Sequence, residues 1–451
     1  MSFPRYQKYK SSGAEWLGQV PEHWKIDRLK RSVLSVKNGT WGEDAKGDRS
    51  DIPCVRVADF NRERLCVSPD IPTIRNVSER ERRGRMLKRG NLLLEKSGGG
   101  ELQPVGAVAL YDSDAPAVCS NFVAVVALAD GMVPSFWRYL HAAAYSVRLN
   151  ARSIKQTSGI QNLDQQQYFD EVAPFPPVHE QGLIAKFLDV ETSKIDALIA
   201  EQERLIELLK EKRQAVIAQA VTKGLNPNAP MKRSGVEWIG DIPAHWEVKP
   251  IGALSEYLSY GFTNPMPTAD EGPLMLTAND IGDGKVDYES ARRTTDEAFH
   301  LLTFKSRPNR GDILITKDGT LGRVAVHDGR KACINQSVAL LRGNARLIFV
   351  PFLAACLSSR PYQDRMLFEA GGTTIKHIYI SRLSKMPIAV PPLREQEDII
   401  EGMSGRTIQM EDLLDEARSA IVLLRERRAA LISAAVTGQI DVRGLAEQKA
   451  A

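Results

Sequence analysis

Hydrophobic residues follow two different spacings along this chain. In residues 1–176 and again in residues 232–391, short β-branched and apolar runs are separated by Gly, Pro, Asn and Asp, a pattern typical of strands joined by turns. After each of these stretches, apolar residues recur at steps of three and four among charged residues, which indicates a long amphipathic helix. The pattern predicts an α+β fold with two strand-rich modules in tandem, each followed by a helix.

The short apolar runs define the strands that we expect. They are 52–57, 91–94, 105–110 and 122–128 in the first module, and 274–277, 312–316, 323–327 and 337–341 in the second. Shorter helical patterns lie near 135–149 and 351–368. Strands and short helices are therefore expected in the same order in both modules.

Each long helical pattern begins after a Pro-Pro motif and covers about 40 residues, enough for about 60 Å at the rise of an α-helix. An apolar stripe of this length needs a partner, so the two helices most simply pack antiparallel as a coiled coil. Two separate surface helices are the alternative. The apolar positions assigned to these partner-binding helices are Ile195, Leu198, Leu205, Leu209, Leu413, Leu414, Ile421 and Leu424.

Several short motifs occur twice in the same order. They are Glu-Trp-x-Gly with Pro-x-His-Trp at 15–24 and 237–246, Pro-Pro-x-x-Glu-Gln at 176–181 and 391–396, and Val-Thr before a glycine at 221–224 and 436–438. Solenoid repeats are only roughly 20 to 50 residues long, whereas Trp16 recurs 222 positions later as Trp238. We therefore expect domains at 1–176 and 232–391, a spacer helix at 177–224, a linker at 225–231, and a second spacer helix with a tail at 392–451.

The composition is that of an ordinary globular protein, with 43% hydrophobic and 26% charged residues. A net charge of +4 does not by itself indicate nucleic-acid binding, so any polyanion must be bound by local patches. Five cysteines without a C-x-x-C motif argue against a disulfide framework and a zinc ribbon. We expect a cytoplasmic protein without an export signal or a membrane span, because the apolar runs are too short.

A strand that ends in a lysine and a glycine-containing loop occurs in both modules. The segments are 90–98 and 311–319, with Lys96 and Lys317 at equivalent places. Such a loop lets backbone N–H groups and a lysine approach a phosphate or a base edge. A tight turn with a solvated lysine is the alternative. Its recurrence in both copies favours a functional loop.

Two further features offer hydrogen-bond donors. Polar loops at 152–157 and 372–377 are rich in groups that can contact base edges or phosphates. The segment 75–89 is strongly basic and is equally consistent with a solvated face and with phosphate contacts. The four repeated tryptophans are expected to be packing anchors.

The residues do not form a catalytic constellation. Asp70, Glu95 and Lys96 superficially resemble a nuclease metal site, but the second copy has Thr316 where the first has Glu95. The Pro-Pro motifs lack the flanking residues of an adenine methyltransferase loop and are interpreted as helix starts. The sequence also lacks a phosphate loop and an H-E-x-x-H motif. We therefore expect neither catalytic residues nor metal ligands.

Taken together, the doubled motifs resemble the specificity subunit of a type I restriction-modification system, over nearly the whole chain. The resemblance implies two target-recognition domains related by a pseudo-twofold axis, each of which reads one half of a bipartite, asymmetric double-stranded DNA target. It also implies two modification subunits that bind S-adenosylmethionine and methylate adenine, and restriction subunits that use ATP and Mg. The chain itself would hold no cofactor and would not be an enzyme.

The candidate DNA-binding residues lie in the loops described above. They are Thr40, Arg56, Lys96, Ser97, Gly98, Arg152, Lys155 and Thr157 in the first module, and Thr263, Thr277, Lys317, Asp318, Thr320, Thr374, Lys376 and His377 in the second. Two alternatives come from other classes. One is a fused restriction and modification enzyme, which the missing cofactor and metal motifs disfavour, and the other is a coiled-coil adaptor that does not bind DNA.

Overall fold

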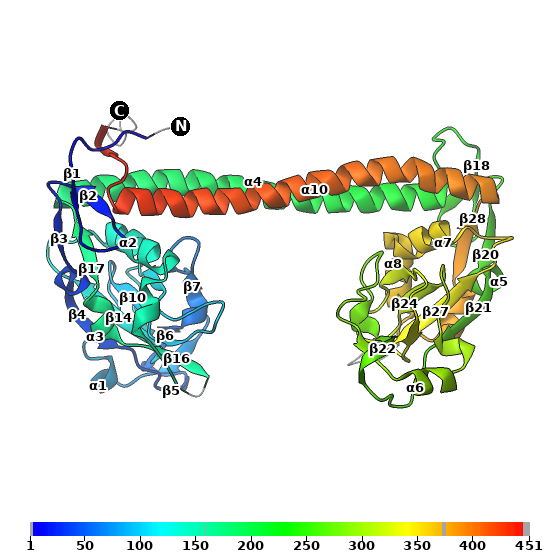
Figure 1. Ribbon diagram of the computed structural model, residues 1–451, viewed down its shortest axis with the longest axis horizontal. Coiled ribbons are helices and arrows are strands. Elements are labelled where there is room, and N and C mark those ends of the chain that lie inside the picture. Colours follow the sequence, from blue (N-terminus) through cyan, green and yellow to red (C-terminus); the bar gives the residue numbers. More distant parts are fainter. Residues whose placement is uncertain (1–2, 158, 372–375, 445–451) are drawn as a thin grey trace. The chain divides into compact units, whose positions relative to one another are not determined.

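The computed structural model describes residues 3–157, 159–371 and 376–444. The chain forms two compact units (Figure 1). Unit 1 comprises Met1–Gln202 and Ser419–Ala451, and unit 2 comprises Glu203–Arg418. Each unit thus combines one strand-rich module with parts of both long helices. Among the described residues, none of the helices is long and apolar enough to cross a membrane.

The described residues of unit 1 form three larger sheets and two strand pairs. The first sheet has the order β4 (Val33–Asn38), β14 (Val123–Leu128), β10 (Leu92–Glu95), β12 (Val108–Leu110), β8 (Cys66–Val67) and β7 (Phe60–Asn61). The second has the order β13 (Val118–Cys119), β6 (Asp51–Val55), β9 (Ile74–Asn76) and β5 (Glu43–Asp44). The third has the order β11 (Ser97–Gly98), β16 (Ile160–Leu163) and β15 (Ile154–Thr157). The pairs are β1 (Tyr9–Ser11) with β2 (Gln19–Pro21), and β3 (Lys25–Arg28) with β17 (Val172–Phe175).

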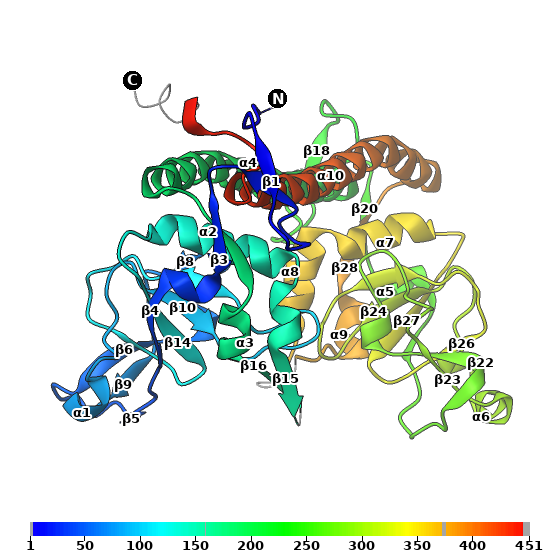
Figure 2. The ribbon, with the colours of Figure 1, turned by 60° about the vertical axis from the view of Figure 1, so that its left-hand side comes forward.

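One core of unit 1 lies between the β10–β14 sheet and α2 (Pro134–Ser146), which lies over that sheet (Figure 2). Leu93 belongs to another buried cluster, with Val55, Ala109 and Val123. All residues of β10 are buried, and its first three residues, Leu92–Leu94, form a short apolar run, as expected for a strand that is covered on both faces. A proline occupies the first turn of α2, where its missing N–H group costs little. The shorter helices are α1 (Glu79–Arg82) and α3 (Gln165–Phe169).

Unit 2 repeats this plan with fewer strands. Its sheets are β21 (Ser255–Tyr260), β27 (Val338–Gly343), β24 (Ile313–Thr316) and β25 (Val324–Val326), and β23 (Arg292–Arg293), β22 (Ala269–Leu276) and β26 (Ala332–Ile334). Its pairs are β18 (Met231–Arg233) with β19 (Asp241–Pro243), and β20 (Glu247–Pro250) with β28 (Pro387–Val390). Its short helices are α5 (Ile251–Leu254), α6 (Asp296–Leu301) and α9 (Ile380–Lys385).

The α+β prediction is confirmed, and each predicted strand run overlaps an observed strand. The helical pattern near 351–368 is confirmed, and it is divided into two helices, α7 (Val350–Ser358) and α8 (Arg360–Glu369), with Ser359 extended between them. Pro361 lies in the first turn of α8, where its ring and missing N–H group prevent the preceding helix from continuing.

The long helices are α4 (Val178–Lys223) and α10 (Leu393–Val436), and they run antiparallel within each unit. In unit 1, Arg428 near the end of α10 pairs with Asp196 in the first half of α4, with 2.8 Å between Nε and Oδ1. In unit 2, Ile217 near the end of α4 shares a core with Ile399 near the start of α10. The long apolar stripe therefore has its partner inside the chain.

The repeated motifs meet at one junction in each unit. In unit 1, the Glu180 carboxylate accepts hydrogen bonds from Trp24 Nε1 at 3.0 Å and Tyr6 at 3.1 Å, and lies 2.6 Å from His23 Nε2. The neighbouring Gln181 side chain accepts a bond from the N–H of Val133, at the start of α2. Pro-x-His-Trp, Pro-Pro-x-x-Glu-Gln and the sheet-covering helix are thus joined by one polar cluster.

Unit 2 builds the same junction from the second copies. Trp246 Nε1 donates to Glu395 at 3.0 Å, His245 lies 2.7 Å from the same carboxylate, and Gln396 accepts from the N–H of Phe349. In both units the repeated motifs therefore make equivalent bonds.

The Val-Thr-glycine ends of the long helices complete the junctions. A Cβ atom at Gly438 would lie 2.3 Å from Pro21 Cδ, and one at Gly224 would lie 3.3 Å from the Trp246 ring. Both glycines have positive φ angles, which glycine adopts most easily. The sequence repeat is therefore a repeat of the frame that joins each module to the helices.

Candidate nucleic-acid interface

Each unit has a pocket at the same place in its module. The first pocket, of about 440 Å³, and the second, of about 660 Å³, both include the loop after the central strand, β10 or β24. The backbone bonds around them match, because the N–H of Lys96 donates to Phe122 O and the N–H of Lys317 donates to Ser337 O, both at 2.9 Å. The two candidate lysines therefore occupy equivalent backbone positions.

A second wall of each pocket is a short 3-10 turn that is capped in the same way. The N–H of Arg56 donates to Asp59 Oδ2 in unit 1, and the N–H of Thr277 donates to Asp280 Oδ2 in unit 2, both at 2.7 Å. Arg56 and Thr277 line their pockets at corresponding places. The two modules thus present different side chains on the same backbone frame.

The first pocket contains a buried carboxylate. Glu95 is only 2% exposed, and its Oε2 accepts a bond from Arg62 at 2.9 Å. Burial raises the pKa of the Glu95 carboxyl, and the positive charge of Arg62 opposes that rise. The pocket is lined by Trp41, Arg56, Val57, Ala58, Glu95, Ser97, Gly98, Gly99, Ser120, Asn121 and Phe122.

The second pocket has a different polar lining. Thr316 stands where Glu95 stands in the first, and its hydroxyl donates to the carbonyl of Thr320. Lys317 is buried, with its Nζ 3.1 Å from Asp318 Oδ2, and Asp318 also pairs with His377. The pocket is lined by Met275, Thr277, Ala278, Asn279, Asp280, Ser290, Arg292, Asp318, Gly319, Asn335 and Ser337.

The structure brings together two features that the sequence presents separately. In unit 1, β11 of the glycine loop pairs with β16, and the hydroxyl of Ser97 donates to Asn162 at 2.6 Å. This places the loop beside the β15–β16 hairpin, which carries Lys155, paired with Asp164 at 2.7 Å. The pairing of Asp318 with His377 brings the corresponding segments together in unit 2.

Of the other candidate residues, Thr40 lies beside the first pocket, and most of the rest are exposed. Thr40 donates its N–H to the carbonyl of Cys119, next to the pocket residue Ser120. Arg152, Thr263, Thr320 and Lys376 are exposed, Thr157 ends β15, and Thr374 lies outside the described residues.

Most arginines of the basic segment 75–89 have structural partners. Arg75 pairs with Asp44, and Arg89 pairs with Asp112 and Asp114. Arg82 donates to the carbonyl of Val77 at 2.7 Å, and Arg85 donates to that of Asn38 at 3.1 Å. These contacts favour the structural interpretation of the segment over a row of phosphate contacts.

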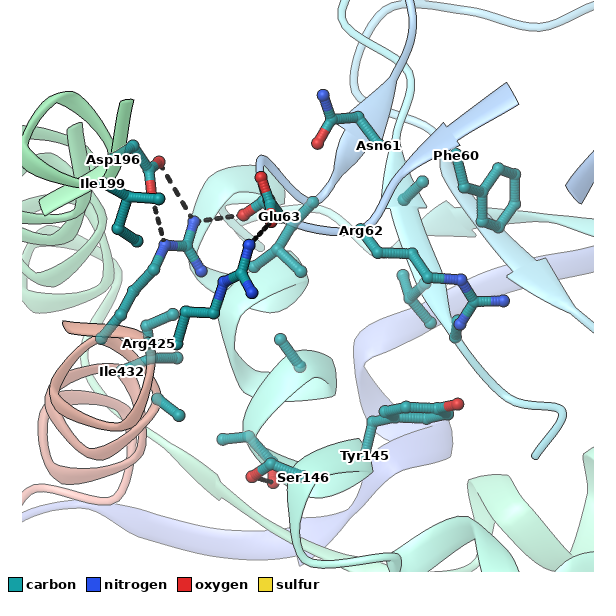
Figure 3. Close-up of a pocket in the computed structure, with 18 residues that line it drawn as sticks. Phe60, Asn61, Arg62, Glu63, Tyr145, Ser146, Asp196, Ile199, Arg425 and Ile432 are labelled. Carbon is teal, nitrogen blue, oxygen red and sulfur yellow. Dashed lines mark hydrogen bonds and ion pairs between the residues drawn. The ribbon is translucent and has the colours of Figure 1, made fainter. Parts of the chain in front are cut away.

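The β7–β8 hairpin connects Glu95 of the first pocket to the long helix α10. Arg62 and Glu63 project in opposite directions from the loop that follows β7, beside an apolar cavity of about 260 Å³ (Figure 3). Glu63 pairs with Arg425 at 3.3 Å, and its carbonyl accepts a bond from Arg428. The loop is therefore held to α10 through Glu63, and the Arg62 side chain is held by Glu95.

Some pocket residues are absent from the sequence-based candidates. Trp41, Phe122 and Asn279 line the pockets but lie outside the glycine loops and polar loops. An alignment of residues 120–122 with 335–337 would have marked part of this set, because the two segments occupy equivalent places. The described residues contain no group of three or more His, Cys, Asp or Glu side chains that could hold a metal ion.

Comparison with known proteins finds one family repeatedly. A family model described as the type I restriction modification DNA specificity domain matches residues 244–411. The EcoBI specificity subunit of a type I restriction enzyme from Escherichia coli is 24% identical over 340 residues, covering 74% of this chain and 71% of that protein. The putative MjaX specificity subunit from Methanocaldococcus jannaschii is 22% identical over 433 residues, covering 95% and 96%.

Solved structures show the same fold. A chain described in work on complex assembly and conformational transition of a type I restriction-modification system has a TM-score of 0.69 at 16% identity, covering 92% of this chain and 98% of that one. The HsdS subunit from Thermoanaerobacter tengcongensis has a TM-score of 0.51 at 15% identity, covering 93% and 98%. The chain is thus similar over most of its length to specificity subunits of type I restriction-modification systems, and residues 244–411 match the DNA specificity domain of that family.

Proposed function

We propose that this chain is a specificity subunit that recognises a bipartite, asymmetric DNA target, with one half-site read by each module. The observation that carries the proposal is the pair of pockets with matching backbone bonds and different side chains. Equivalent frames can approach DNA in equivalent ways, whereas the bases selected depend on the side chains that reach their edges. Unlike pockets therefore predict unlike half-sites.

The long helices are proposed to act as the spacer between the half-sites. Two half-sites read from one side of DNA lie about 34 Å apart for each helical turn. Both α4 and α10 contribute residues to both units. The proposal is therefore that the length of these helices sets the gap between the two half-sites. Adenine methylation or DNA cleavage would be carried out by modification and restriction subunits, which would supply S-adenosylmethionine, ATP and Mg.

A reconstitution experiment tests this function. Modification subunits are purified with and without this chain, and adenine methylation is measured on a plasmid library. We expect methylation of one defined sequence only when this chain is present. Equal methylation by the modification subunits alone would contradict the proposal, and so would methylation by this chain alone.

The partner surface is proposed to lie on the outward-facing leucines of the long helices. Of the eight positions marked in the sequence, Ile195, Leu209, Leu414 and Ile421 are buried, Leu424 is half-buried, and Leu198, Leu205 and Leu413 are exposed. In unit 2, Leu205 and Leu413 are 41% and 46% exposed, and Leu208 and Ile408 are exposed as well. Exposed leucines on both helices provide apolar area for a modification subunit.

A charge at this surface should separate partner binding from folding. We expect Leu413→Asp to weaken binding of the modification subunit about tenfold to a hundredfold, since burying one leucine at an interface contributes about 1.5–3 kcal/mol. Leu414→Asp should instead unfold the helix pair, because Leu414 is only 4% exposed. Isothermal titration calorimetry and circular dichroism measure the two effects.

Leu34→Asp is the matched control, because Leu34 is 71% exposed and belongs to β4, not to the long helices. It should change neither binding nor folding. Full-strength partner binding by a folded Leu413→Asp variant would contradict the proposed surface.

A further inference from the structure

We propose that Glu95 is a specificity-determining residue, whose carboxylate accepts a hydrogen bond from the exocyclic amine of a cytosine in the half-site read by the first module. This inference rests on the proposed function and adds the base pair that the first pocket selects. Glu95 lines that pocket although its side chain is almost fully buried. A base edge entering the pocket would therefore meet an acceptor that is shielded from water.

Gly98 leaves space beside the buried Glu95 carboxylate within the pocket. Gly98 has a φ of +115°, and a Cβ atom there would lie 3.9 Å from Glu95 Oε1. A larger side chain at this position would extend over that oxygen, and its backbone conformation would be strained. The loop therefore leaves an opening on the side of the carboxylate that faces the pocket.

Arg62 holds the other carboxylate oxygen. Its Nη2 lies 2.9 Å from Glu95 Oε2, and the side chains are 28% and 2% exposed. A charge-assisted bond of this kind fixes the orientation of the carboxylate and supports its negative charge. Because a carboxylate only accepts hydrogen bonds, the oxygen on the pocket side selects a donor such as an amine.

Arg56 lines the same pocket, and its guanidinium is a hydrogen-bond donor that complements the Glu95 acceptor. In the major groove, cytosine presents an amine donor and its partner guanine presents two acceptors, N7 and O6. A carboxylate and a guanidinium together match these two sides of a C·G pair. Trp41 and Phe122 also line the pocket and are 38% and 44% exposed, so aromatic surface is available to contact the pair.

The second pocket has no carboxylate at the position of Glu95, although Asp280 and Asp318 line it elsewhere. The Thr316 hydroxyl is engaged by Thr320 O and also accepts the N–H of Arg323 at 2.9 Å. The requirement for an amine at this position should therefore be confined to one half-site. The first module has Glu95 where the second has Thr316, which argues against a metal site shared by both modules. On the present proposal, the same difference makes the two modules select different bases.

Glu95→Gln gives a directional test. Arg62 can only donate, so the amide oxygen of the glutamine should face Arg62 and its NH₂ group should face the pocket. The acceptor is thereby replaced by a donor. The preferred base should shift from cytosine to one with a carbonyl at that place, thymine, at one position of the target only.

The measurement uses the assembled methyltransferase complex and fluorescence anisotropy on target duplexes. Each cytosine is replaced in turn by 2-pyrimidinone, which lacks the amine. We expect the wild-type complex to lose about tenfold in affinity at one position, as for a hydrogen bond to a charged group, and the Glu95→Gln complex to lose nothing further there. Thr316→Val, the equivalent change in the second pocket, should keep the wild-type dependence.

Two further variants distinguish base reading from a structural ion pair. Arg62→Lys retains a cation beside Glu95 and should retain the amine dependence, whereas Glu95→Asp retains the charge, shortens the side chain and should reduce the dependence. A Glu95→Gln complex with the full wild-type loss would overturn the inference, as would a wild-type target without an amine-dependent cytosine. A wild-type complex that binds an unrelated duplex as tightly as the unmodified target would instead contradict the proposed function itself.

Discussion

A chain in which residues 247–390 are replaced by a copy of residues 25–175 is expected to recognise two copies of the same half-site. The exchanged segments begin and end with strands that pair with each other, β3 with β17 and β20 with β28. The junction motifs lie outside the exchanged segments and make equivalent bonds in both units. The inserted module should therefore dock on the second frame as it does on the first.

The expected change is large, because the whole second half-site should be replaced. The methylated sequence is read by sequencing DNA from cells that carry the variant and its partner subunits. The reverse replacement, with residues 247–390 in both places, is the matched control and should give two copies of the other half-site. A variant that still methylates the original asymmetric target would show that specificity lies outside the exchanged segments.

Trp24→Ala should destabilise unit 1 by about 3–5 kcal/mol, the usual cost of removing a large buried aromatic side chain. Trp24 is fully buried, and the truncation also removes the N–H donor to the buried Glu180 carboxylate. Trp24→Phe keeps most of the ring and loses this donor, so it should cost about 1–3 kcal/mol. Urea unfolding followed by far-ultraviolet circular dichroism measures both.

Trp41→Ala is the matched control in the same unit, because Trp41 is 38% exposed. It should lower the free energy of unfolding by less than Trp24→Ala. The equivalent change in the second junction, Trp246→Ala, should destabilise unit 2 in the same way, since Trp246 is also fully buried and bonds to Glu395. Equal effects of Trp24→Ala and Trp41→Ala would show that the junction does not anchor the module.

Periodicity predicted the elements that are long or strongly apolar. The α4 and α10 helices and the central strands β10 and β24 have a pattern that local sequence determines. The short parallel pairings of β13 with β6 and of β26 with β22 were not predicted, because two or three residues carry no periodic signal. Their pairing depends on contacts between segments that are distant in sequence.

The candidate site was predicted in part for a similar reason. The glycine loops and polar loops are visible in the sequence, but their contact through Ser97 and Asn162, or Asp318 and His377, is tertiary. The outward and inward leucines of the long helices could not be separated either, since both kinds recur at helical spacing. Lys317 illustrates the same limit, because its burial beside Asp318 depends on packing.

The central claim is that two unlike modules read one split target. Sequencing of methylated adenines in cells that carry this chain with its modification subunits tests it most directly. The account predicts a single sequence made of two different half-sites separated by a gap of fixed length. A continuous or palindromic methylated sequence would contradict it.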